Sequence, residues 1–87
     1  MPFQDVRVFR DERFSVGVEQ PSGQPYLSIP VSNGFVDYEE YYRLERAELD
    51  RFLADPRAAA EFAERCRRRE LDHLLIQKPG SNRGVPI

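Results

Sequence analysis

Residues 14–36 read FSVGVEQPSGQPYLSIPVSNGFV, and this stretch decides the fold. It contains two turn signals, Ser22-Gly23 and Asn33-Gly34, each placed between runs in which apolar residues recur at every second position. Such dipeptides are typical of two-residue β-hairpin turns, and a period of two is typical of strands with one buried face. The stretch therefore predicts three antiparallel strands joined by two tight turns.

Two-residue turns would bring apolar residues opposite one another in both hairpins. The expected pairs are Val18 with Leu27, Val16 with Ile29 and Phe14 with Val31 in the first, and Val31 with Val36 and Ile29 with Tyr38 in the second. All of these residues then share one face of the sheet, so turn chemistry and hydrophobic alternation agree. The prediction is open to one test, because Tyr38 must lie opposite Ile29.

The flanking residues extend this sheet. Residues 3–10 alternate weakly and predict a first strand, and the stronger strands are expected at 13–20, 25–31 and 35–43. With a loop at 10–12, Val8 would face Phe14 and Val6 would face Val16. Proline cannot donate to a β-ladder, so Pro30 predicts a bulge, an edge or a frayed end.

Residues 37–44 (DYEEYYRL) fit two structures. Asp37 followed by Glu40 resembles a capping box that opens a helix, whereas tyrosine-rich alternation favours a strand. The hairpin register already needs Tyr38 in an extended conformation. We therefore predict a strand.

Helical signals begin at residue 45. Residues 45–54 place Leu49, Phe52 and Leu53 on one face, and Asp55-Pro56 is typical of an N-cap followed by proline at the first helical position. A second helix is expected at about 56–75, with an abrupt bend between the two. The predicted fold class is α+β: an antiparallel meander of three to four strands followed by two helices packed on one sheet face.

Length and composition narrow the possible functions. A chain of 87 residues with 40% hydrophobic and 32% charged residues predicts one globular domain, here 1–76. The Gly- and Pro-rich tail, 77–87, is expected to be flexible or to be tied back through Val85 and Ile87. A net charge of −2, with neither half of the chain strongly basic, disfavours nucleic acid as a partner.

Localisation follows from similar arguments. No apolar run approaches a membrane span, and the charged N-terminal segment does not resemble a signal peptide. One cysteine cannot form an intrachain disulfide or a cysteine zinc cluster. A protein of the bacterial cytoplasmic type is the default expectation.

No catalytic, metal or cofactor motif is recognisable in the sequence. We expect no bound cofactor, because the sequence contains no P-loop, dinucleotide fingerprint or nucleophile elbow. Cys66 has the neighbours of a small buried hydrophobe, and His73 is suited to a helix C-terminus. On a continuous helix, seven residues would separate these two side chains by about 10 Å, too far for a catalytic dyad.

The second predicted helix carries a cluster of arginines. This cluster, Arg65, Arg67, Arg68 and Arg69, is a candidate anion-binding site, and nucleic acid is one possible ligand. The alternative is a solvated helix face stabilised by the i,i+4 pairs Glu61–Arg65 and Glu64–Arg68. We favour the solvated face.

The sheet face turned away from the helices combines aromatic rings with carboxylates. Its candidate protein-binding residues are Tyr26, Tyr41, Glu19, Asp37, Glu39 and Phe35. Tyr26 and Tyr41 are expected to be direct cross-strand neighbours and to act as anchors, while the acids select a basic partner. The tyrosines could instead only stabilise a solvent-facing sheet.

The sequence thus predicts a small, non-enzymatic interaction module of the inhibitor or immunity type. It would bind a protein through the sheet face, or form a homodimer through a sheet edge. Two alternatives stay open. One is an enzyme or ligand-binding domain with a site between sheet and second helix, using Glu40, Tyr42 and Arg69. The other is nucleic-acid binding through Arg65–Arg69.

Overall fold

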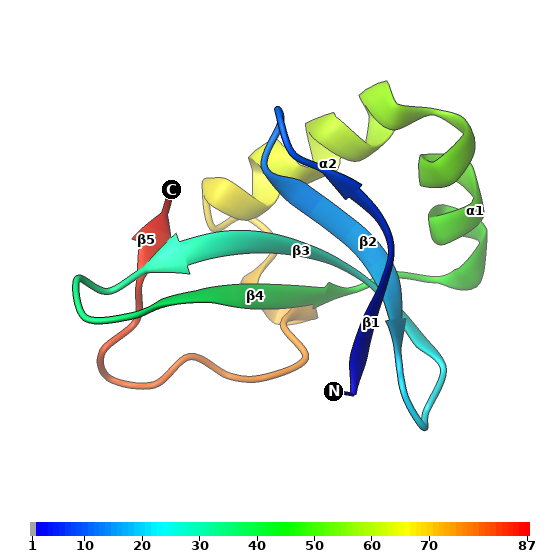
Figure 1. The fold of residues 1–87 in the computed structure, drawn as a ribbon. Helices are drawn as coiled ribbons and strands as arrows, with labels where there is room; N and C mark the ends of the chain where they lie inside the picture. The colour runs from blue at the N-terminus through cyan, green and yellow to red at the C-terminus, as the bar shows by residue number, and fades with distance from the viewer. Residues whose placement is uncertain (1) are drawn as a thin grey trace.

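The computed structural model describes residues 2–87 and has the predicted α+β class (Figure 1). The elements are β1 (Phe3–Phe9), β2 (Phe14–Glu19), β3 (Gln24–Ser32), β4 (Asp37–Arg43), α1 (Arg46–Ala54), α2 (Pro56–Arg67), a 3-10 turn η1 (Asp72–Leu74) and β5 (Val85–Pro86). The first four strands form an antiparallel sheet in chain order, and β5 pairs with β3. Both α-helices pack on one face of this sheet, where most of the buried hydrophobic side chains gather.

Both predicted hairpin registers are wrong by two residues. Val16 lies opposite Leu27 rather than Ile29, and Tyr38 lies opposite Val31 rather than Ile29. A shift of two keeps the side chains within the strands on their predicted face, because side chains alternate with a period of two. Val36 is the exception: it was expected on the core face but lies in the loop before β4 and is 57% exposed. The core face is therefore correct: Val16, Leu27, Ile29 and Val31 are fully buried.

The cause is that both loops contain four residues instead of two. In the first, the Gly23 N–H donates to Glu19 O (2.7 Å), and Gly23 has a positive φ of 74°. In the second, Asn33 Oδ1 accepts hydrogen bonds from the N–H groups of Phe35 (2.9 Å) and Val36 (3.0 Å). This Asx-turn holds Phe35 and Val36 in the loop, so Val36 does not pair with Val31.

The prediction of which β1 side chains point to the core is also wrong over the second half of the strand. Phe9, not Val8, lies opposite Phe14, and Val6 and Val8 are 56% and 50% exposed. The loop runs over 10–13 and is one residue longer than assumed, which exchanges the two faces. A bulge between Asp5 and Arg7 then restores the expected register at Phe3–Asp5.

Pro30, which cannot donate to a β-ladder, lies where β3 changes its partner strand. The β2–β3 ladder ends at Ser28, and β5 pairs with β3 from Val31. Pro30 contributes its carbonyl, which accepts from the Ile87 N–H (3.2 Å). The end of the tail is thus hydrogen-bonded to β3, which is the second of the two arrangements considered for it in the sequence analysis.

The strand at Asp37–Arg43 and the first helix are confirmed. Asp55 caps α2 by accepting a hydrogen bond from the Ala58 N–H (3.4 Å), with Pro56 at the first helical position. However, α2 ends at Arg67, eight residues early. The Glu70 N–H donates to Arg65 O and the Arg69 N–H to Cys66 O, which is the Schellman pattern. Arg69 has a φ of 60° at the position where glycine is usual, so the sequence carried no stop signal.

Candidate functional site

The outer sheet face is partly closed by β1. Tyr26 is 0% exposed, so it is not a surface anchor, which corrects the prediction. Its ring packs edge-on against Tyr41 (5.0 Å between centroids), and the Phe3 ring stacks on Tyr41 (3.7 Å) and meets Tyr26 edge-on (5.5 Å). Tyr26 lies opposite Arg43, and Tyr41 lies opposite Ser28, so the two tyrosines are diagonal rather than direct neighbours.

Gly17 makes this closure possible. A Cβ there would lie 2.2 Å from Gln4 O and 2.7 Å from the Tyr26 hydroxyl, so no larger residue fits without a shift of β1. The Tyr26 hydroxyl donates to Asp5 Oδ1 (2.5 Å), and burial followed by this bond raises the Tyr26 pKa. Tyr26 therefore attaches β1 to the rest of the sheet.

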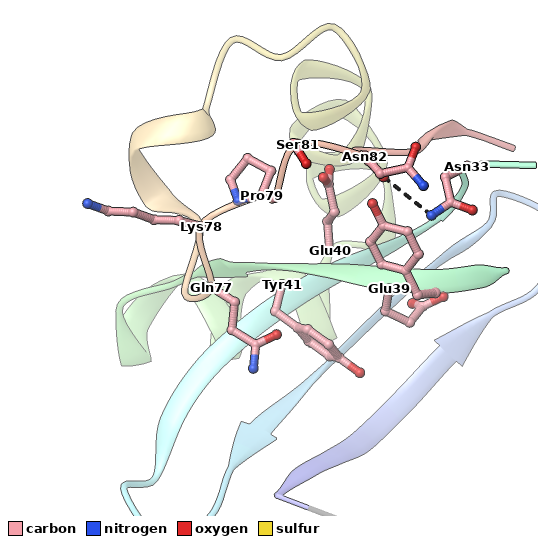
Figure 2. Close-up of a pocket in the computed structure, with 11 residues that line it drawn as sticks. Asn33, Glu39, Glu40, Tyr41, Gln77, Lys78, Pro79, Ser81 and Asn82 are labelled. Carbon is pink, nitrogen blue, oxygen red and sulfur yellow. Dashed lines mark hydrogen bonds between the residues drawn. The ribbon is translucent and has the colours of Figure 1, made fainter. Parts of the chain in front are cut away.

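Glu39 is the predicted site residue with the most unusual surroundings. Its side chain is half-buried beside Tyr41 on the outer face, and Figure 2 shows both pointing to the same side of β4. Burial raises the pKa of Glu39; a hydrogen bond with Ser28 opposes this shift, and the charge of Asp5 adds to it. Burial, followed by the charge of Glu39, also raises the pKa of Tyr41. Among residues 2–87, no cation forms a salt bridge with Glu39.

The remaining predicted protein-binding residues lie toward the two ends of the sheet. Glu19 accepts a hydrogen bond from the Ser22 hydroxyl near the first turn, whereas Asp37 is exposed at the start of β4. Phe35 is 87% exposed in the loop between β3 and β4. The structure therefore does not bring all six into one patch.

Exposed apolar residues gather at the Phe35 end of the sheet. We define the apolar tip as four large exposed hydrophobic residues: Phe35, Val36, Val85 and Ile87. Val85 pairs with Ser32 at the end of β3, so β5 lies beside the loop that carries Phe35 (Figure 1). Of these four, sequence reasoning included only Phe35 in the binding surface. It placed Val36 on the core face, and it could not foresee the pairing of β5 with β3, which joins segments about 50 residues apart.

Glu40, named in the alternative enzyme site, is occupied by an ion pair. It is 7% exposed, and its two oxygens accept from Arg83 Nε (2.7 Å) and Nη2 (3.1 Å). The Tyr42 hydroxyl also donates to Glu40 (3.1 Å), while Arg69 lies apart, donating to Gly84 O (3.2 Å). Both carboxylate oxygens are thus engaged within the chain.

Arg83 is the residue that sequence reasoning missed. It also forms two hydrogen bonds with Asp72 (2.8 and 2.9 Å), and these lower the Asp72 pKa and raise that of Arg83. No local signal could reveal it, since Arg83 lies 43 residues from Glu40 in a Gly- and Pro-rich tail. Its guanidinium ties the tail to β4 and η1.

A cavity of about 410 Å³ lies between β4 and the tail (Figure 2). It is lined by Asn33, Tyr38, Glu39, Glu40, Tyr41 and residues 77–82. The tail closes it at both ends: the Ile76 N–H donates to Tyr41 O (2.9 Å), and Asn33 Nδ2 donates to Asn82 O (3.3 Å). Glu39 is the partly buried carboxylate in this lining that forms no salt bridge with any of residues 2–87.

The arginines of the predicted anion site are all engaged inside the chain. Arg65 and Arg68 pair with Glu70, Arg67 pairs with Glu64 and donates to the carbonyls of Glu12 and Arg13, and Arg69 donates to Gly84 O. The expected i,i+4 pairs are replaced by these contacts, because α2 ends early and Glu70 comes within reach of Arg65 and Arg68. These bonds favour a structural role for the cluster.

Cys66 is buried, as predicted, and burial raises the pKa of its thiol to about 12. His73 is exposed on η1. Residues 2–87 contain no group of three or more His, Cys, Asp or Glu side chains arranged to hold a metal ion. Over the same residues, neither α-helix is both long and apolar enough to cross a membrane.

Comparison of the chain with known proteins does not assign it to a family. No protein-family model, no curated protein and no solved structure matches the chain.

Proposed function

We propose that this chain is a small protein-binding module of the inhibitor or immunity type, without catalytic activity of its own, that acts in the bacterial cytoplasm. The apolar tip supplies the main contact, and Asp37 and Glu39 give the surface an acidic border. The partner is therefore a protein with an apolar pocket and basic residues around it.

The observation that carries this proposal is the presentation of Phe35. Its ring is 87% exposed, yet its loop is held by the Asx-turn at Asn33 and by the bond between Asn33 and Asn82. An exposed aromatic side chain on a preorganised loop loses little conformational entropy on binding, and aromatic residues dominate the energetics of protein interfaces. Tyr26 has no part in the revised surface.

The enzyme and nucleic-acid alternatives have less support. Both oxygens of Glu40 already accept hydrogen bonds from Arg83, which leaves no free base at that site. The arginines at 65–69 are engaged with carboxylates and carbonyls of the same chain.

A pull-down from the native host tests the proposal. The wild type is compared with Phe35→Ala/Val36→Ala and with Val6→Ala/Val8→Ala, a matched pair of exposed hydrophobic residues on β1. A specific partner should be recovered by the wild type and the β1 variant, and at least tenfold less by the tip variant. Equal recovery by all three proteins would contradict the proposal.

A further inference from the structure

The edge of β4 that faces away from β3 is incompletely paired. The Ile76 N–H donates to Tyr41 O, so the main-chain groups of Tyr41 point to this outer edge. In an antiparallel ladder, alternate residues point the same way, so Glu39 and Asp37 also direct their N–H and C=O groups outward. Within residues 2–87, the segment paired to this edge is Leu75–Ile76, at one end of the strand.

The cavity lies along the unpaired part of the edge. The tail leaves β4 after Ile76 and returns at Asn82, and the residues between are exposed (Figure 2). Its volume of about 410 Å³ is within the range of ligand sites in proteins. Residues 37–40 span roughly 13 Å at about 3.3 Å per residue, the length of a short added strand.

We propose that this slot, between β4 and residues 77–82, accepts an extended segment of the protein partner as an additional strand. The inference rests on the proposed function and names how the partner is held. The incoming main chain would bond to the N–H and C=O of Glu39, as in other cases of strand addition.

The charge of Glu39 specifies the chemistry of that segment. Its carboxylate is half-buried and has no salt bridge in residues 2–87, and Asp37 lies two residues earlier on the same face. Lys78 extends away from Glu39 in Figure 2. A residue opposite Glu39 in an added strand shares its face, so the segment carries Lys or Arg at that position.

The experiment uses randomised heptapeptides displayed on phage as the probe. Peptides selected on the wild type are synthesised, and their binding is measured against Glu39→Pro, which removes the outward N–H at a position where an edge strand tolerates proline. Glu39→Gln is the matched control, because it keeps the N–H and removes the charge. Ser81→Phe fills the slot without altering β4, and so tests the slot independently of the folding of Glu39→Pro.

The selected peptides should contain a basic residue and bind at least tenfold more weakly to Glu39→Pro and to Ser81→Phe. Glu39→Gln should weaken them less, and the Glu39 amide should exchange more slowly in the bound state. Peptides unaffected by either blocking variant, or no selected peptide at all, would overturn the inference. Peptides that depend on Phe35 instead would overturn it while leaving the proposed function intact. A wild-type dimer that dissociates in Glu39→Pro would assign the edge to a second copy of this chain and overturn it as well.

Discussion

Replacing Arg83 by alanine should destabilise the protein strongly. The substitution leaves Glu40, 7% exposed, without its counter-charge, although the Tyr42 hydroxyl still donates to it. Removing one partner of a buried ion pair typically costs about 3–5 kcal/mol. The contact with Asp72 adds little, since that side chain is 40% exposed and exposed pairs contribute about 0–1 kcal/mol. We therefore expect a loss of about 3 kcal/mol in the free energy of unfolding.

Urea denaturation followed by circular dichroism measures this loss. For a domain of this size it corresponds to a decrease in Tm of roughly 12–24 °C, at about 4–8 °C per kcal/mol. The double variant Glu40→Leu/Arg83→Met is the control, because well-packed apolar residues often replace a buried ion pair at little cost. It should recover most of the stability.

Loss of Arg83 could also act locally, by releasing the tail and letting water reach Glu40. Amide exchange at Ile87, whose N–H donates to Pro30 O, reports this opening. A variant Arg83→Ala that keeps its stability within 1 kcal/mol of the wild type and keeps Ile87 protected would refute the reasoning.

Two further predictions concern Gly17 and Cys66. Gly17→Ala should lower the free energy of unfolding by about 1–3 kcal/mol, because the added Cβ would clash with Gln4 O. Gly80→Ala is the neutral control, because a Cβ at that position meets no atom within 4 Å. Equal stability of the two variants in urea denaturation would contradict the packing argument. The Cys66 pKa is raised from 9.0 to about 12, so the folded state favours the protonated thiol. Its contribution to stability is complete below about pH 9 and is lost as the pH rises toward 12. The wild type should accordingly lose stability relative to Cys66→Ala over that range. Alkylation of the native thiol at pH 9 should also be at least about 100-fold slower than alkylation of the unfolded protein in urea. The reason is that a rise of about three pKa units reduces the thiolate fraction by two to three orders of magnitude. Alkylation at similar rates with and without urea would show that the thiol is accessible.

The core face of the sheet could be predicted well, because it depends on alternation within single strands. Leu27, Ile29 and Val31 are all buried, although their expected partners were displaced by two residues. The displacement arose in the loops, where an Asx-turn at Asn33 and a bond from Gly23 to Glu19 changed the loop length without changing the face. The second half of β1 shows the opposite case, since one extra loop residue exposed Val8 and buried Phe9.

The candidate site was predicted less well, because it depends on contacts between distant segments. The sequence correctly put Tyr26, Tyr41 and Glu39 on one sheet face, but nothing in it indicated that Phe3 and Asp5 would cover Tyr26. The role of Arg83 was missed for the same reason.

The amino-acid sequence by itself determined the strand and helix types, the division of the sheet into a core face and an outer face, and the break at Asp55-Pro56. These features follow from the period-two geometry of a strand and from local capping, which involve residues a few positions apart. Only the tertiary structure decided which outer-face residues reach solvent and what neutralises Glu40. Those outcomes depend on how β1 lies over the sheet beside Gly17 and on the return of the tail to β4, and both join residues that are far apart in the chain.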